Sequence, residues 1–148
     1  MLAKDIMIKD VITANGKDTL EDVARIFVEK NISGMPVVDD DHKVIGIISE
    51  GDLVYQQKPL AQPMFINLFD GILQVDRKDF WEELNKMAAY EVDQLMSKHV
   101  VTAHENTPIN EIASLMINKK INRIPIVDDD GRLVGLITRQ DIIRNVYL

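Results

Sequence analysis

Two hydroxyl residues in this sequence are each followed, three positions later, by an aspartate. Ser49 precedes Asp52 in the run ISEGD, and Thr138 precedes Asp141 in the run ITRQD. At a helix start the hydroxyl can accept a backbone N–H while the carboxylate reaches back to the cap, which is a capping box. The same geometry offers phosphate a hydroxyl and free N–H groups, and it offers a ribose diol a carboxylate acceptor. Both interpretations are open, and they do not exclude each other.

The surroundings of the two pairs differ in charge. Arg123 and Arg139 accompany Thr138 in the sequence, and two guanidinium groups beside a helix start form a good phosphate site. Gly34 and Glu50 hold the corresponding positions near the first pair. Glu50 would repel phosphate, whereas Gly34 would allow the backbone to approach adenine or a bare nucleoside. The alternative for the two arginines is a solvated helix face.

The sequence does not support a calcium loop, a metal site or a catalytic motif. The triplets Asp39–Asp41 and Asp128–Asp130 lack the alternating acids of a calcium loop, and Arg132 stands where a ligand is needed. We therefore interpret them as hairpin turns. The three histidines have no metal-ligand spacing and no cysteine partners. No phosphate-binding loop, nucleophile elbow or kinase motif is found, so we predict neither an enzyme nor a metal site.

Both pairs belong to an internal repeat. Residues 5–55 align with residues 94–144 at a constant offset of 89 without a gap, and 16 of the 51 aligned pairs are identical. A unit of about 50 residues is usually too small to bury a sufficient core alone. Two copies packed face to face around a pseudo-twofold axis would solve that problem.

Each copy predicts the same elements in the same order. A short β-branched strand precedes an amphipathic helix, two apolar strands joined by an acidic turn, and a last helix. The fold class is therefore α/β (α+β), with the order β-α-β-β-α twice. Asp18 with Glu21 predicts the start of the first amphipathic helix, and Ile47 and Leu136 are expected at equivalent buried positions. The expected ranges are Val11–Thr13, Leu20–Val28, Met35–Val38, Val44–Ile48 and Glu50–Tyr55, then Val100–Thr102, Ile109–Ile117, Ile124–Val127, Leu133–Ile137 and Arg139–Tyr147.

This pattern resembles the CBS domain in its tandem form, the Bateman module. The runs that carry the resemblance are ISGMPVVD from Ile32 and IGIISEGD from Ile45, then INRIPIVD from Ile121 and VGLITRQD from Val134. The stretches 5–7 and 94–96 also look like the short helix that opens a CBS repeat. We accordingly divide the chain into residues 1–55 as repeat 1, residues 56–93 as an insert with a helix, and residues 94–148 as repeat 2.

The resemblance implies a regulatory module for an adenine nucleotide. The Ser or Thr would contact phosphate, the Asp would grip ribose, and adenine would lie in an apolar slot near the strand ends. AMP, ADP or ATP is the implied ligand, without a cofactor; S-adenosylmethionine or a cyclic dinucleotide is an alternative, and a ligand-free dimerisation or scaffold module is another. A homodimer and an effector protein addressed in trans are expected. The implied binding residues are Thr102, Ile121, Asn122, Arg123, Ile124, Pro125, Ile137, Thr138, Arg139 and Asp141, and in the first copy Thr13, Ile32, Ser33, Gly34, Met35, Pro36, Ile48, Ser49 and Asp52.

Composition and charge limit the classes of partner and the cellular location that we expect. The chain has 148 residues, a net charge of -7 and no cysteine, which argues against nucleic-acid binding and disulfides. Residues 94–148 nevertheless carry seven basic and six acidic side chains, so an anionic ligand should prefer the second copy. The sequence predicts no signal peptide and no membrane helix, which needs about 18 apolar residues. We expect a cytoplasmic protein.

The segment 56–93 has no counterpart in the repeat. Met64–Leu73 is unusually apolar, and Asp79–Tyr90, which includes Trp81, shows helical spacing. We interpret the segment as a cover for its own module or for a dimer mate. A lid or docking surface that senses ligand is the alternative.

Overall fold

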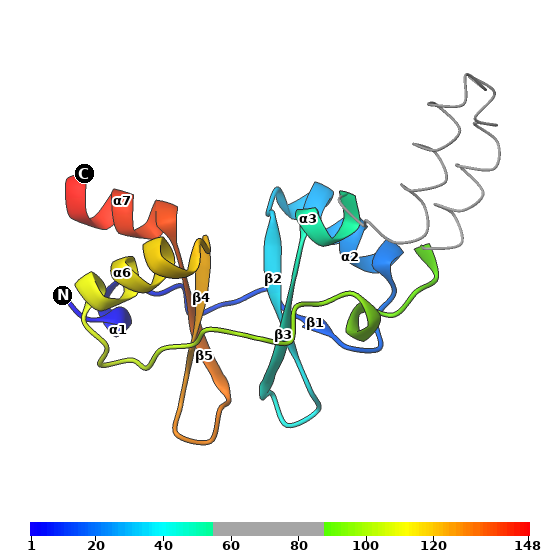
Figure 1. The fold of residues 1–148 in the computed structure, drawn as a ribbon, viewed down its shortest axis with the longest axis horizontal. Coiled ribbons are helices and arrows are strands. Elements are labelled where there is room, and N and C mark those ends of the chain that lie inside the picture. Colours follow the sequence, from blue (N-terminus) through cyan, green and yellow to red (C-terminus); the bar gives the residue numbers. More distant parts are fainter. Residues whose placement is uncertain (55–87) are drawn as a thin grey trace. The chain divides into compact units, whose positions relative to one another are not determined.

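The structure is a computed structural model, and it describes residues 1–54 and 88–148. The predictions for Met64–Leu73 and Trp81 lie outside the described residues. The remaining elements follow the expected order (Figure 1). They are α1 (Ala3–Ile6), β1 (Ala14–Asn15), α2 (Leu20–Lys30), β2 (Gly34–Val38), β3 (Val44–Ser49), α3 (Glu50–Val54), the 3-10 helix η1 (Val92–Gln94), α6 (Ile109–Lys119), β4 (Arg123–Val127), β5 (Leu133–Thr138) and α7 (Arg139–Tyr147).

These elements confirm the mixed α/β fold class, but the first strand of each copy was predicted at the wrong place. Val11–Thr13 is irregular, and the strand β1 follows it. In the second copy Val100–Thr102 is likewise irregular, and a single parallel bridge forms at Ala103. Ala14 and Ala103 are both buried. Their small side chains let the backbone approach the neighbouring strand, so packing overrides the β-propensity of the residues before them.

The strands form two groups. β1, β2 and β3 make a three-stranded sheet in that order, with β1 parallel to β2, and β4 pairs with β5 antiparallel. β2 is buried along its whole length, as its apolar sequence predicted. β3 instead alternates between buried and half-buried residues. Leu136 is buried as expected, but the prediction of a buried Ile47 is wrong, because that side chain is half-buried.

The two long helices are amphipathic, as their spacing predicted. Three side chains of each are buried: Leu20, Val23 and Phe27 on α2, and Ile109, Ile112 and Met116 on α6. The buried stripe is narrower than the apolar pattern, because Val28 is 82% exposed and Ile117 is 73% exposed. An exposed apolar side chain by itself needs no explanation, but both of these continue the apolar face of their helix.

α2 begins one residue later than the pattern of Asp18 and Glu21 predicts. The N–H of Thr19 donates to the carboxylate of Asp22 over 3.2 Å, and the N–H of Asp22 donates to the Thr19 hydroxyl over 3.2 Å. The bond from the Thr19 N–H favours the ionised carboxylate and is the first cause that holds the pKa of Asp22 below its ordinary value, and the Thr19 side chain lowers the pKa further. Both registers satisfy a capping pattern, and the structure has the later one, with Leu20 buried in the first helical turn.

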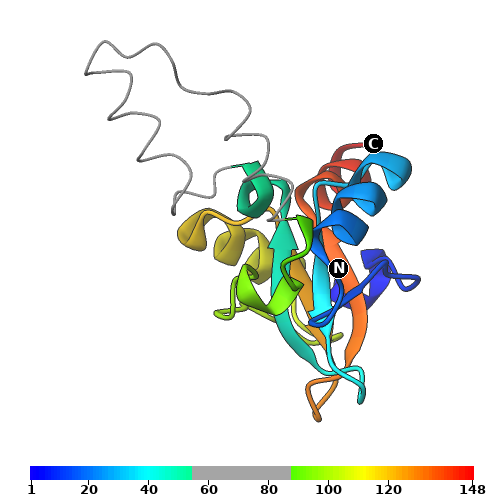
Figure 2. The same ribbon diagram turned by 90° about the vertical axis from the view of Figure 1, so that its right-hand side faces the viewer.

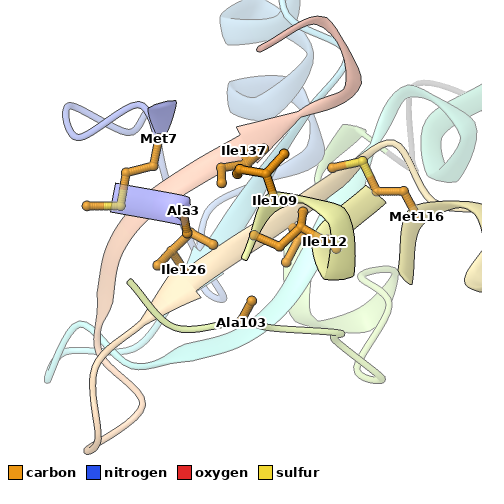
Figure 3. Close-up of a cluster of buried hydrophobic side chains, with 9 residues drawn as sticks. Ala3, Met7, Ala103, Ile109, Ile112, Met116, Ile126 and Ile137 are labelled. Carbon is orange, nitrogen blue, oxygen red and sulfur yellow. The ribbon is translucent and has the colours of Figure 1, made fainter. Parts of the chain in front are cut away.

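The second copy is packed around a cluster of nine buried hydrophobic side chains (Figure 3). The cluster joins β4, β5 and α6. Two of its members, Ala3 and Met7, come from the N-terminus of the chain instead. The others are Ala103, Ile109, Ile112, Met116, Ile124, Ile126 and Ile137. The opening segment of the first copy therefore completes the core of the second.

This opening segment, residues 1–8, is called the first lead, and its backbone is hydrogen-bonded to the second copy. Figure 2 shows it in dark blue beside the orange strand β5. Ile8 and Leu136 donate to each other over 2.8 and 2.9 Å. Three further bonds join Ala3 N–H to Thr107, Lys4 N–H to Glu105 and Ile109 N–H to Met1, at 2.9, 2.9 and 3.1 Å.

The second lead, residues 90–97, makes the same bonds to the first copy. Ser97 and Ile47 donate to each other over 2.9 and 3.0 Å. Shifting every residue of the first set by 89 positions gives the other three bonds. They join Val92 N–H to Asp18, Asp93 N–H to Gly16 and Leu20 N–H to Tyr90, at 2.8, 3.0 and 2.9 Å. The two copies have therefore exchanged their leads.

The acidic triplets form hairpin turns, as predicted. Asp39 Oδ1 accepts the backbone N–H groups of Asp41 and Lys43, each over 2.9 Å. Asp128 Oδ1 accepts the equivalent pair, from Asp130 and Arg132, over 2.9 Å. These side-chain acceptors close the turns, which accounts for one aspartate of each triplet.

Contacts group the chain into two compact units that do not follow the repeat. One unit contains Met1–Asn15, Met35–Ile47 and Ser97–Leu148, and the other contains Gly16–Gly34 and Ile48–Met96. All five bonds of the first lead lie within the first unit. The whole hydroxyl–aspartate pair of the second copy, Thr138 with Asp141, lies in that unit as well.

Candidate functional site

The hydroxyl–aspartate pair of the second copy forms a complete capping box. Thr138 caps α7, and both its N–H and its hydroxyl donate to Asp141 Oδ2, over 2.8 and 2.7 Å. The N–H of Asp141 donates to Thr138 Oγ1 over 3.3 Å. Asp141 is 5% exposed, and it is the only buried charged side chain among the described residues. The capping interpretation of this pair is confirmed.

Capping leaves acceptor capacity on the carboxylate. Asp141 Oδ1 lies 3.9 Å from the guanidinium of Arg144, which is mostly exposed. A carboxylate offers about four lone-pair sites, and the capping bonds occupy two of them on the other oxygen. Asn145 Nδ2 donates to the Asp141 carbonyl over 2.7 Å and holds the same turn of α7. The carboxylate is thus fixed in place by bonds that do not exhaust it.

Arg144 and Asn145 were not predicted from the sequence. They follow Asp141 by three and four positions on a helix, and residues at that spacing are neighbours on one face. Once the helix start is placed at Thr138, this spacing is a signal that would have identified both.

The first copy repeats the arrangement with fewer bonds. The N–H and hydroxyl of Ser49 donate to Asp52 Oδ2 over 2.8 and 3.2 Å. Both side chains are half-buried. The next N–H, of Glu50, donates to the carbonyl of Ser33 over 2.9 Å. The Glu50 side chain is exposed, so the helix start of α3 carries a negative charge.

In the second copy the strands bring basic residues to the start of α7. The N–H of Arg139 donates to the Asn122 carbonyl over 3.0 Å. The β4–β5 register sets Arg123 opposite Thr138. Arg123 is half-buried and Arg139 is exposed. The backbone thus places Arg123 opposite Thr138 and Arg139 directly after it.

The residues of the predicted site divide into two groups by burial, one buried and one half-buried or exposed. Ile124 and Ile137 are fully buried in the core cluster, so their side chains are part of the packing between the strands and α6 (Figure 3 labels Ile137). The other buried residues of the predicted set are Gly34, Met35, Pro36, Ile48, Pro125 and Asp141. The half-buried or exposed ones are Thr13, Ile32, Ser33, Ser49, Asp52, Thr102, Ile121, Asn122, Arg123, Thr138 and Arg139.

Residues 1–54 and 88–148 contain neither a cluster of metal ligands nor a membrane-spanning helix. No group of three or more His, Cys, Asp or Glu side chains in these ranges could hold a metal ion. No helix within the same ranges has the length and apolarity to cross a membrane.

Comparison with known proteins gives a family match over both copies. The model of the CBS domain matches residues 3–58 and 92–148. The uncharacterized protein MJ1426 of Methanocaldococcus jannaschii is 37% identical over 97% of this chain and 89% of its own length. The L-aspartate semialdehyde sulfurtransferase of the same organism is 33% identical over 97% of this chain, but that match spans 23% of the enzyme.

Solved structures resemble the chain over nearly its full length. The CBS domain pair of protein MJ0100, in complex with 5'-methylthioadenosine and S-adenosyl-L-methionine, superposes with a TM-score of 0.71 at 29% identity, over 99% of this chain and 95% of that chain. CBSX2 in complex with AMP gives a TM-score of 0.75 at 23% identity, over 98% and 95% of the two chains. The second likeness concerns the fold alone.

Proposed function

Because the chain belongs to the CBS domain family, we propose that it is a regulatory module that binds an adenine nucleotide and signals to a partner protein. The observation that carries the proposal is Asp141, a buried carboxylate fixed by Thr138 with acceptor capacity to spare. A ribose diol is a ligand group that such a carboxylate can hold through two hydrogen bonds. A 29% identical CBS pair that carries two adenosyl compounds supports the adenosine part of the ligand.

The second copy is the preferred site for a ligand that carries phosphate. Arg139 is exposed beside the start of α7, and Arg123 lies opposite Thr138 in the sheet register. Guanidinium groups and the positive end of a helix both favour phosphate. In the first copy Glu50 holds the position of Arg139 and would oppose phosphate there.

S-adenosylmethionine is a second candidate ligand, favoured by the adenosyl compounds in the MJ0100 complex. Its sulfonium and amino groups are cationic, so it needs no arginine and would be compatible with the exposed Glu50 of the first copy. A site at the second copy would instead place these cations near Arg139. The two candidates are therefore separated by which copy they occupy.

Titration of the purified protein with AMP, ATP and S-adenosylmethionine, with analysis of products, tests the proposal. Binding of AMP or ATP without turnover supports a nucleotide sensor. Binding of S-adenosylmethionine alone supports the second candidate. Turnover of any of the three would make the protein an enzyme, and absence of binding would support a scaffold module.

We also propose that the partner includes a second copy of the chain, docked through helices. Apolar side chains at the C-terminal helix and on α6 are exposed: Ile117, Ile143, Val146 and Tyr147 are 73%, 54%, 50% and 77% exposed. A symmetric contact between two such faces would bury them in both protomers. An effector protein would then recognise the ligand-dependent form of the dimer.

A further inference from the structure

The first lead, residues 1–8, contacts both elements that build the second site, β5 and α7. β5 ends at Thr138, and α7 carries Asp141. The first lead packs against each of them: α1 lies against α7 and β5, and Ile8 is hydrogen-bonded in both directions to Leu136, two residues before Thr138. The first lead therefore contacts both elements that carry the hydroxyl–aspartate pair.

The fit between the lead and β5 is tight. A Cβ added at Gly135 would lie 2.5 Å from Met7 Sδ and 2.8 Å from Met7 Cγ. Gly135 immediately precedes Leu136, so side-chain packing and backbone bonds act on adjacent residues. Met7 is 9% exposed and belongs to the same core cluster as Ile137. Movement of the first lead would accordingly shift the last residues of β5, since packed interiors transmit small shifts.

We propose that the first lead is the positioning element of the second site. The lead does not touch the ligand in this proposal; it acts through the strand that carries the hydroxyl of Thr138. The proposal rests on the proposed function. By linkage, a ligand that favours the ordered Thr138–Asp141 pair also favours docking of the lead. Occupancy of the second site would thereby be reported at the N-terminus of the chain.

The test replaces one backbone donor in each lead. Ile8→Pro removes the N–H that donates to Leu136, and Met7, with φ -64° and ψ 145°, already has the conformation that a following proline requires. Ser97→Pro removes the equivalent N–H to Ile47 and is the matched control. Both variants are made in an Asp52→Ala parent, so that AMP binding reports the second site.

We expect Ile8→Pro to weaken AMP binding by about fivefold, the equivalent of one hydrogen bond, and Ser97→Pro to leave it unchanged. Amide hydrogen exchange should rise at Thr138 and Asp141 in the first variant only. Equal effects of the two prolines, or none from either, would overturn the proposal.

Gly135→Ala covers the case in which Ile8→Pro does not fold. It keeps every backbone donor and displaces only Met7, so it should reproduce the loss of AMP affinity and the faster exchange at Thr138. Unchanged affinity and exchange in this variant would contradict the proposal. If the Asp52→Ala parent binds no AMP, the proposed function fails at that site, while the exchange measurement still decides whether the lead positions the pair.

Discussion

At the scale of single residues, the charge of Arg139 separates phosphate recognition from adenosine recognition. Arg139→Ala should weaken AMP binding by about 1–3 kcal/mol, as expected for a hydrogen bond to a charged group, and should change adenosine binding little. Calorimetric titration of the variant with both ligands measures the difference. Gln140→Ala, one position further along the exposed start of α7, is the control and should affect neither. Equal losses for AMP and adenosine would refute a phosphate role for Arg139.

The cap of α2 gives a residue-scale prediction that depends on pH. The pKa of Asp22 is lowered, first by its bond from the Thr19 N–H. A carboxyl with a lowered pKa stabilises the fold above its unfolded pKa of about 3.9, and this contribution is lost as the pH falls through the folded pKa. Thr19→Pro, which removes that N–H, should move the Asp22 pKa back towards its ordinary value in an NMR titration. Thr19→Ser keeps both bonds and should leave the pKa lowered; an unchanged pKa in the proline variant would contradict the assigned cause.

At the scale of elements, the contact between the first lead and β5 predicts a specific coupling. Gly135→Ala forces Met7 aside and should cost roughly 1–3 kcal/mol, the usual range for an overpacked core. Because Met7 is the group displaced, Met7→Ala should cost less in the Gly135→Ala protein than in the wild type. Urea unfolding of the two single variants and the double variant gives the interaction energy. Additive losses would mean that Met7 does not carry the strain.

Gly131→Ala is the matched glycine control for that cycle. Gly131 has φ 83° and nothing within 4 Å of an added Cβ. Its replacement should therefore cost about 1 kcal/mol from the left-handed backbone alone. Met7→Ala should not change that cost.

The helices and strands were largely predictable from the sequence, but the copy against which each lead packs was not. Periodicity identified α2, α6 and the two hairpins, because burial of one face leaves a spacing in the sequence. The exchange of leads left no such trace. The two copies match at a constant offset, so each lead suits either copy equally well in composition. The packing of Ala3 and Met7 in the core of the second copy and the backbone hydrogen bonds of the two leads distinguish the two arrangements.

In the candidate site, too, the local pattern was predictable from the sequence and the burial was not. The pairs of Ser49 with Asp52 and Thr138 with Asp141 were found from local spacing, because a helix start places such residues within one turn. The burial of the Asp141 side chain was not predictable from that spacing. Neither was the burial of Ile137, whose place in an apolar run suits a ligand slot and a core equally well.

At the scale of the whole molecule, the exposed apolar residues of α6 and α7 predict a homodimer. Ile143 is 54% exposed on α7. Ile143→Lys should convert the dimer to a monomer by placing a charge in the buried contact, as measured by light scattering at micromolar concentration. Lys120→Glu, a charge change at an exposed helix end, is the control and should leave the dimer intact. A wild-type protein that is monomeric at high micromolar concentration would contradict the prediction.

The most direct test of the account is a calorimetric titration of AMP into the wild type, Asp141→Ala and Asp52→Ala, with the melting temperature of each. Asp141→Ala should lose about 1–3 kcal/mol of AMP binding, because polar partners remain unpaired, and its melting temperature should also fall, because the capping box is lost. Asp52→Ala should keep the tighter AMP site. If Asp141→Ala melts at a lower temperature but binds AMP like the wild type, the capping box is the whole explanation of that aspartate, and the proposed site is contradicted.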